Sequence, residues 1–328
     1  MNTPRPKILL EKTKKKLVIE WKSLQIYHDA KASGEYNWPE WCYMPLQAYY
    51  AALTMSMGKN IDVEKMNLVG IFAALDAWRL TQGIYRYDEE IYQSLLSTKI
   101  DEKIPCDVFL RLPEWCVYIE TPGQVFLNFE LFGFFCFAEC LEEQDKKLHF
   151  LLDTPDGIFH IPLQLRDTVS ESLNAFVKFF TLNQELDKIK GEHKESMKQG
   201  YKEVLKLLPL VLYLCSKEPE ILLNNQQPEF KRPVPKKIKG GLKHFDAERP
   251  KNYEVGYRIG KFIKEYNQNR SSGSTGTGMS IAPHIRKAHW HLYWIGKGRT
   301  NYDIKWLPPT PVNIKDDDDI ITTIREVK

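Results

Sequence analysis

Three histidines lie close together near the end of the chain, where their spacing could support catalysis, metal binding or recognition. They are His284, His289 and His291, within the segment PHIRKAHWHLYWIGKG at 283–298. Side chains alternate between the two faces of an extended strand, so His289, His291 and Tyr293 share one face at intervals of roughly 6.6 Å. Neutral imidazoles at this separation could bind zinc, or act as general acid and base in a metal-independent ribonuclease.

A recognition surface and a purely structural hairpin are the other two alternatives, and the neighbouring residues favour recognition. Imidazole and aromatic rings offer stacking and hydrogen bonds to a peptide or to RNA. A register that pairs Ile295 with Tyr302 places Trp306 opposite His291 and puts Asp303 on the other face, so His289 and His291 alone would leave a metal under-ligated. We therefore predict a non-catalytic protein without a metal or cofactor. Its predicted partner-binding residues are His284, Arg286, His289, His291, Tyr293 and Trp306.

A C-terminal β-hairpin is expected to position these residues. The turn-forming residues Gly296, Gly298 and Asn301 separate two alternating segments, and Pro308 ends the second of them. Before the hairpin, residues 271–278 are rich in Ser, Gly and Thr, which predicts a flexible tether.

The rest of the chain predicts an α+β protein, an antiparallel β-meander flanked by helices. Five segments with a period of two are separated by turn signals such as Pro113-Glu114, and they are 104–111, 115–120, 131–141, 148–153 and 158–165. Residues 131–137 are apolar on both faces and should form a central strand. The expected covering helices are 62–81, 168–180 and 200–216, the last kinked at Pro209. In the first of these, Asp76 and Arg79 lie one turn apart and predict a buried ion pair.

Five regions follow one another along the chain. We expect an N-terminal helical segment at 1–60, with one long helix at 6–33, a helix-and-sheet core at 61–223, a basic Pro/Lys-rich loop at 224–250, a helix, tether and hairpin at 251–313, and an acidic tail at 314–328. The basic loop is a candidate RNA-binding surface, and a solvated connection is the alternative. Its candidate residues are Lys231, Arg232, Lys236, Lys237 and Lys239.

Composition limits the class of protein. The chain of 328 residues has 46 Lys and Arg against 43 Asp and Glu, a net charge of +3, so any role in nucleic-acid binding must depend on local clusters. No apolar run approaches the ~20 residues that span a bilayer. The start lacks the apolar core of a secretory signal, so we expect a cytoplasmic protein. The six scattered cysteines should be buried free thiols.

Several short blocks occur in a fixed order between about residues 65 and 313. They are AWRLTQGIY at 77–85 with DEEI at 88–91, VFLRLPEWCVY at 108–118, LLP, LC and EP within 207–219, and PHIR, HWH and YW from 283 onward, ending at Trp306 and Pro308. In order and approximate spacing they resemble the type V-A anti-CRISPR proteins of the VA-two family. The resemblance does not extend to the first 60 residues, the basic loop or the acidic tail.

The resemblance implies an inhibitor that lowers production of the type V-A CRISPR effector nuclease. Proteins of this family recognise the effector's nascent N-terminal peptide during translation and cause loss of its mRNA. They are carried by phages, plasmids and other mobile elements, so the expected location is the cytoplasm of a bacterial host. The implied partner is that peptide, with the ribosome or mRNA as further candidates and no membrane. The family offers no catalytic residues to transfer.

Two other functions stay open from the residues themselves. One is a ribonuclease that uses His284, His289 and His291, and the other is an RNA- or ribosome-binding module that uses the basic loop.

Overall fold

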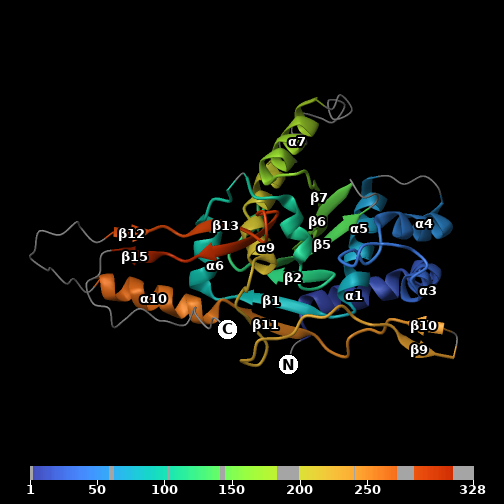
Figure 1. Ribbon diagram of the computed structural model, residues 1–328. Coiled ribbons are helices and arrows are strands. Elements are labelled where there is room, and N and C mark those ends of the chain that lie inside the picture. The colour runs from blue at the N-terminus through green and yellow to red at the C-terminus, as the bar shows by residue number, and fades with distance from the viewer. Residues whose placement is uncertain are drawn as a thin grey trace, which may run out of the picture.

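A mixed sheet of seven strands, in the order β7-β6-β5-β2-β1-β11-β8, runs through the centre of the molecule (Figure 1). The computed structural model describes residues 3–58, 63–101, 103–140, 145–182, 199–239, 241–271 and 284–312. Helices pack on both faces of the sheet, which confirms the predicted α+β class.

Four neighbouring strands of the sheet form the predicted antiparallel meander: β2 (Cys116–Glu120), β5 (Gly133–Cys140), β6 (Lys146–Thr154) and β7 (Gly157–Gln164). Every residue of β5 is buried, and β5 lies in the interior of the sheet as expected. The prediction of a strand at 104–111 was wrong, because Cys106–Arg111 forms the 3-10 helix η1. Cys106 and Phe109 both face the core, and a spacing of three residues fits one turn of such a helix.

The sheet also contains parallel strands, which the sequence pattern does not indicate. Strand β1 (Gly83–Tyr87) pairs in parallel with β2 and with β11 (Lys251–Val255), and β8 (Ile221–Leu222) adds to the far edge of β11. The pairing of β1 with β11 joins two regions that are far apart in the sequence.

On one face of the sheet lie five N-terminal helices: α1 (Arg5–Lys16), α2 (Val18–Ser23), α3 (Gln25–Ser33), α4 (Leu46–Met57) and α5 (Val63–Trp78). The single helix expected at 6–33 is broken into three. The break at Leu17 has a non-helical backbone, and Leu10, Leu17 and Leu24 are all almost completely buried. The breaks allow the chain to wrap around the core and bury all three leucines.

The other face is covered by α6 (Glu89–Ser97), α7 (Val169–Leu182), α9 (Leu208–Cys215) and α10 (Tyr257–Ser271). Helix α7 begins with a capping box, in which Thr168 and Glu171 exchange two hydrogen bonds of 3.3 Å between side chain and backbone. The expected single helix at 200–216 is instead two helical pieces, and α9 begins at Leu208. Pro209 therefore lies in a first turn, where its missing N–H costs nothing, and not at a kink.

Four small sheets of two strands each lie outside the central sheet in the described part of the chain. At the C-terminal end, β13 (His289–Ile295) pairs with β14 (Asn301–Leu307), as predicted, and β12 (His284–Arg286) pairs with β15 (Thr310–Val312). Within the basic region, β9 (Lys236–Ile238) and β10 (Gly241–Lys243) form a hairpin where a loop was expected, and β3 (Val125–Phe126) pairs with β4 (Phe129–Glu130).

Three other expectations concern the thiols, the membrane and the terminal segments. All six cysteines are buried and free, as predicted. Among the described helices, none is both long and apolar enough to cross a bilayer. The tether from residue 272 onward and the acidic tail at 314–328 lie outside the described residues.

Candidate functional site

The hairpin of β13 and β14 has a register one residue away from the expected one. Its cross-strand neighbours are Trp290 with Trp306, Leu292 with Ile304, and Trp294 with Tyr302. The turn is one residue shorter than the sequence suggested, because Ile295 pairs with Asn301. Within it Gly296, Gly298 and Arg299 adopt positive φ. Trp306 therefore shares a face with Trp290 and not with the histidines.

The shared face of Trp290, Ile304 and Trp306 anchors the hairpin in the main core. Both tryptophans are 6% exposed and Ile304 is 0% exposed. The indole N–H of Trp306 donates to the Thr98 hydroxyl at 3.3 Å, and its ring meets Tyr213 edge-on. Trp306 thus holds the hairpin in place and does not lie on the surface that we predicted for it.

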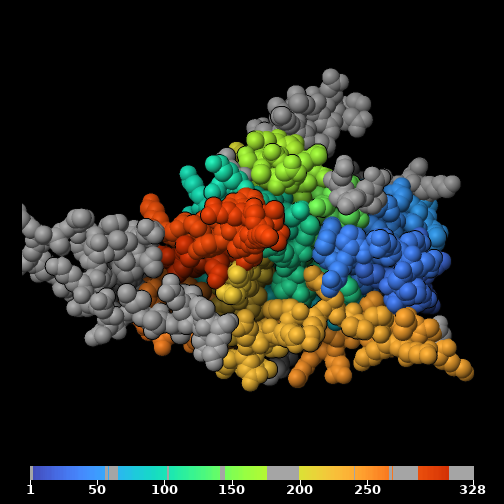
Figure 2. All heavy atoms as spheres, in the orientation of Figure 1, coloured from blue at the N-terminus to red at the C-terminus, as the bar shows by residue number. Residues whose placement is uncertain are grey.

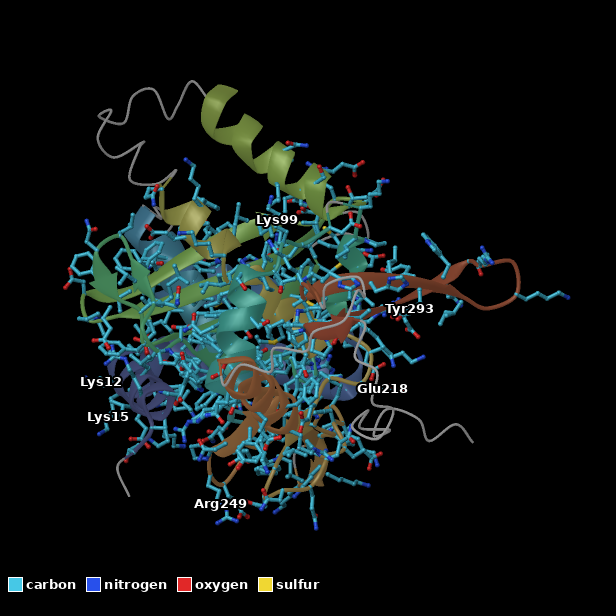
Figure 3. The ribbon with its side chains drawn as sticks, turned by 90° about the vertical axis from the view of Figure 1, so that its left-hand side faces the viewer. Lys12, Lys15, Lys99, Glu218, Arg249 and Tyr293 are labelled. Carbon is cyan, nitrogen blue, oxygen red and sulfur yellow. The ribbon has the colours of Figure 1, made fainter. Side chains whose placement is uncertain are left out.

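Beyond this anchored root, the tip of the hairpin exposes three large apolar side chains. Tyr293, Trp294 and Ile295 are 37%, 53% and 39% exposed, and Tyr293 lies where the hairpin extends from the body (Figure 3). The rings of His291 and Tyr293 pack at a centroid distance of 4.2 Å on one face, and those of Trp294 and Tyr302 at 6.0 Å on the other. We call residues 291–295 the aromatic tip.

The carboxylate that the expected register excluded does lie on the histidine face, since Asp303 is opposite Tyr293. It is already paired: Lys217 contacts it at 2.8 Å and Arg111 at 3.8 Å. The hydrogen bond to Asp303 raises the pKa of Lys217. In the described part of the chain, no group of three or more His, Cys, Asp or Glu side chains is placed to hold a metal ion.

The predicted site residues are only partly brought together. His289 and His291 share a face with Tyr293, and the His289 Nδ1 lies 3.0 Å from the Lys287 carbonyl, to which it must donate. His284 and Arg286 are in the separate ladder of β12 and β15, and only their backbone is described.

The predicted RNA-binding cations divide into a partly buried arginine and exposed lysines. Arg232 is directed inward, where its guanidinium donates to the Leu112 carbonyl at 2.8 Å and burial lowers its pKa. Lys231 pairs with Glu229 at the surface. Three exposed lysines remain on and beside the β9–β10 hairpin, which projects from the body (Figure 2): Lys236, Lys237 and Lys239.

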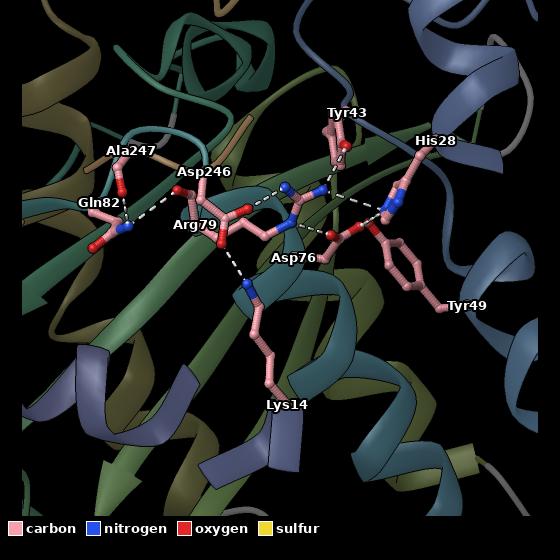
Figure 4. Close-up of polar contacts among 9 residues, drawn as sticks. All are labelled: Lys14, His28, Tyr43, Tyr49, Asp76, Arg79, Gln82, Asp246 and Ala247. Carbon is pink, nitrogen blue, oxygen red and sulfur yellow. Dashed lines mark hydrogen bonds and ion pairs between the residues drawn. The ribbon is translucent and has the colours of Figure 1, made fainter. Parts of the chain in front are cut away.

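A buried polar network joins the N-terminal helices to the basic region (Figure 4). Asp76 accepts from Arg79 at 2.6 Å and from Tyr49 at 2.9 Å, and it lies 2.8 Å from the His28 Nε2. Arg79 also pairs with Asp246 at 2.6 Å. Burial opposes ionisation of Asp76, but His28 and Arg79 outweigh it and lower its pKa. The predicted Asp76–Arg79 pair is confirmed, and no local pattern could have identified His28 or Asp246 as its partners.

Glu114, which the sequence places in a turn, is a second buried carboxyl. It is 4% exposed, and its Oε1 accepts from the Tyr253 hydroxyl at 3.4 Å. Burial raises its pKa to about 7. Gly83 packs against it so closely that a Cβ there would overlap the carboxyl group. Glu114 therefore contacts strand β1 through Gly83 and strand β11 through Tyr253. It belongs to the block at 108–118, one of those that resemble the family.

Comparisons with known proteins agree with this architecture. The model of the AcrVA2-like family, described as the anti-CRISPR type V subtype A2 family, matches residues 85–314. The chain is 24% identical over 262 residues to Protein FinQ of Escherichia coli, covering 73% of this chain and 75% of that protein. Its fold matches the crystal structure of AcrVA2 with a TM-score of 0.65 and 24% identity, over 94% of this chain and 99% of the other. Since the family match spans most of the chain and includes the anchored hairpin, this protein belongs to the AcrVA2-like anti-CRISPR family.

Proposed function

We propose that this anti-CRISPR protein lowers production of the type V-A CRISPR effector nuclease by recognising its nascent N-terminal peptide in the host cytoplasm, which leads to loss of the effector mRNA. The observation that carries the proposal is the aromatic tip, because it presents exposed Tyr293 and Trp294 on a hairpin whose root is fixed in the core. Rigid aromatic side chains supply much of the binding energy at protein interfaces at a low cost in conformational entropy.

Replacing Trp294 with alanine is expected to weaken binding of a synthetic peptide with the effector's N-terminal sequence by about tenfold or more, because an interface aromatic is commonly worth more than 1 kcal/mol. Titration calorimetry measures this. Met55→Ala is the matched control, since Met55 is 69% exposed on helix α4, far from the hairpin. Equal affinity of the wild-type protein for a scrambled peptide would contradict the proposal.

A contact with RNA is a second candidate function, and the β9–β10 hairpin favours it. Lys236, Lys237 and Lys239 are exposed, and none forms an ion pair with a residue that the structure describes. The histidine-dependent ribonuclease stays a prediction from the sequence, because the structure describes the side chains of only two of its three histidines.

Changing Lys236, Lys237 and Lys239 together to glutamine is expected to lower RNA association and to reduce the slope of log affinity against log salt by roughly two, since each lost phosphate contact on a single strand removes ~0.7. Filter binding of RNA over a salt series measures both. The control is the triple change of the exposed Lys12, Lys15 and Lys16 in helix α1. If both triple variants change the slope equally, the contact is not specific to the hairpin.

A further inference from the structure

The two edges of the β13–β14 hairpin differ in what covers them. In an antiparallel pair, every second residue directs its N–H and C=O away from the partner strand. On β14, the Tyr302 carbonyl accepts from Arg111 at 3.1 Å and the Ile304 carbonyl accepts from the Lys217 N–H at 2.8 Å. The backbone N–H and C=O groups of Tyr302 and Ile304 therefore point away from β13. Both carbonyls on this outer edge of β14 already have a partner.

The residues opposite them on β13 must also direct their backbone N–H and C=O groups outward. Leu292 is opposite Ile304 and Trp294 is opposite Tyr302, so their N–H and C=O groups point away from the ladder. Within the described ranges, no residue bonds to these four backbone groups. The free edge thus has two donors and two acceptors, spaced roughly 6.8 Å apart along the strand.

Strand β13 also lacks the devices that usually protect a free edge. Edge strands are commonly blunted by charged residues, proline or a bulge. The sequence of β13, His289–Ile295, contains no Asp, Glu, Lys, Arg or Pro, whereas β14 contains Asp303 and Lys305. An unprotected edge beside exposed aromatic rings is typical of a strand that gains a partner.

We propose that the outer edge of β13 binds an extended peptide as an additional β-strand. Only a polypeptide backbone offers donors and acceptors at the matching repeat, which favours a peptide over RNA. Side chains of the added strand would lie alternately beside Trp294 and beside the His291–Tyr293 pair. The exposed Lys287 and Lys297 flank the two ends of β13, so an acidic residue near either end of the peptide fits best. The inference rests on the proposed peptide recognition and specifies how the peptide is held.

The test uses the intact protein and N-methylated peptides. Because only the peptide is modified, the fold of the protein is unchanged. Two probes are titrated: a synthetic peptide with the effector's N-terminal sequence, and peptides selected from a random library on the same protein. One backbone nitrogen of the peptide is methylated at a time. Methylation at every second position is expected to weaken binding about tenfold, because each lost main-chain hydrogen bond costs about that factor in affinity. Methylation at the positions in between should have little effect.

Proline substitutions examine the same bonds from the protein side. Leu292→Pro and Trp294→Pro each remove an outward N–H from the free edge and should each weaken binding about tenfold more than the corresponding alanine variant. Tyr302→Pro, compared with Tyr302→Ala, removes the equivalent group from the occupied edge and should cause no such additional loss.

Each outcome decides between the two proposals. Binding of the effector peptide without the period of two, or without an effect of the two β13 prolines, overturns the edge inference and leaves peptide recognition standing. Periodic binding of library peptides alone supports the edge and overturns the proposed partner. Binding of neither peptide, or tighter binding of a single-stranded RNA oligonucleotide that Trp294→Ala abolishes, overturns the edge inference.

Discussion

Replacing Asp76 with alanine is expected to lower the free energy of unfolding by about 3–5 kcal/mol, because removing one partner of a buried ion pair leaves the other charge uncompensated. Asp76 is 0% exposed, and its loss would remove the fully buried carboxylate partner of Arg79 and leave Tyr49 without its acceptor. Urea unfolding followed by circular dichroism measures the change.

The control for Asp76 is the exposed pair of Glu229 and Lys231, whose side chains are 74% and 73% exposed. Glu229→Ala should change the free energy of unfolding by no more than about 0.5 kcal/mol, since solvent screens such pairs. A loss at Asp76 as small as that at Glu229 would show that Asp246 alone can compensate the charge of Arg79.

Replacing Glu114 with glutamine is expected to stabilise the protein at pH 8 by about 3 kcal/mol and to flatten the pH dependence of its stability. The pKa of Glu114 is raised from 4.5 to about 7 in the folded protein. Below pH 4.5 the Glu114 carboxyl is protonated in both the folded and the unfolded state, so its contribution to stability is fully present. Between that pH and about 7 the folded state binds more protons than the unfolded state, so stability falls as the pH rises. Glutamine is neutral throughout and avoids this loss.

Urea unfolding from pH 4 to pH 8, with the wild-type curve subtracted from that of Glu114→Gln, isolates this effect. Desolvation lowers the pKa of the partly buried His160 to about 3, so this residue makes the protein less stable as the pH falls. His160 is present in both proteins, so its contribution cancels in the difference. Glu120→Gln is the control, because Glu120 is partly exposed and pairs with Arg86 at the surface. Parallel curves for wild type and Glu114→Gln would contradict the assignment.

Features set by neighbours in the sequence were predicted well. The meander follows from alternating apolar residues and turn signals, and the start of α7 from Thr168 and Glu171. The failures involve partners that are distant in sequence. Nothing near Gly83 indicates that β1 pairs in parallel with β11, because that pairing depends on contacts between remote segments.

The candidate site shows the same division. The hairpin was predictable, but its register depends on the backbone conformation of the turn, where Gly296, Gly298 and Arg299 adopt positive φ. An error of one residue in the register placed Trp306 and Asp303 on the wrong faces. Charge alone also could not separate the partly buried Arg232 from the exposed Lys236, because Arg232 is held by the Leu112 carbonyl of a remote segment.

The position of β1 between β2 and β11 has a consequence for the order in which the protein can fold during its own synthesis. Strand β11 is made long after β1 and β2, and until it emerges from the ribosome the outer edge of β1 has no partner. Pairings between segments so distant in sequence form slowly, and an open strand edge can associate with other chains in the meantime. Completion of the sheet is therefore a late step, and a chain that stops short of residue 251 would carry an aggregation-prone edge.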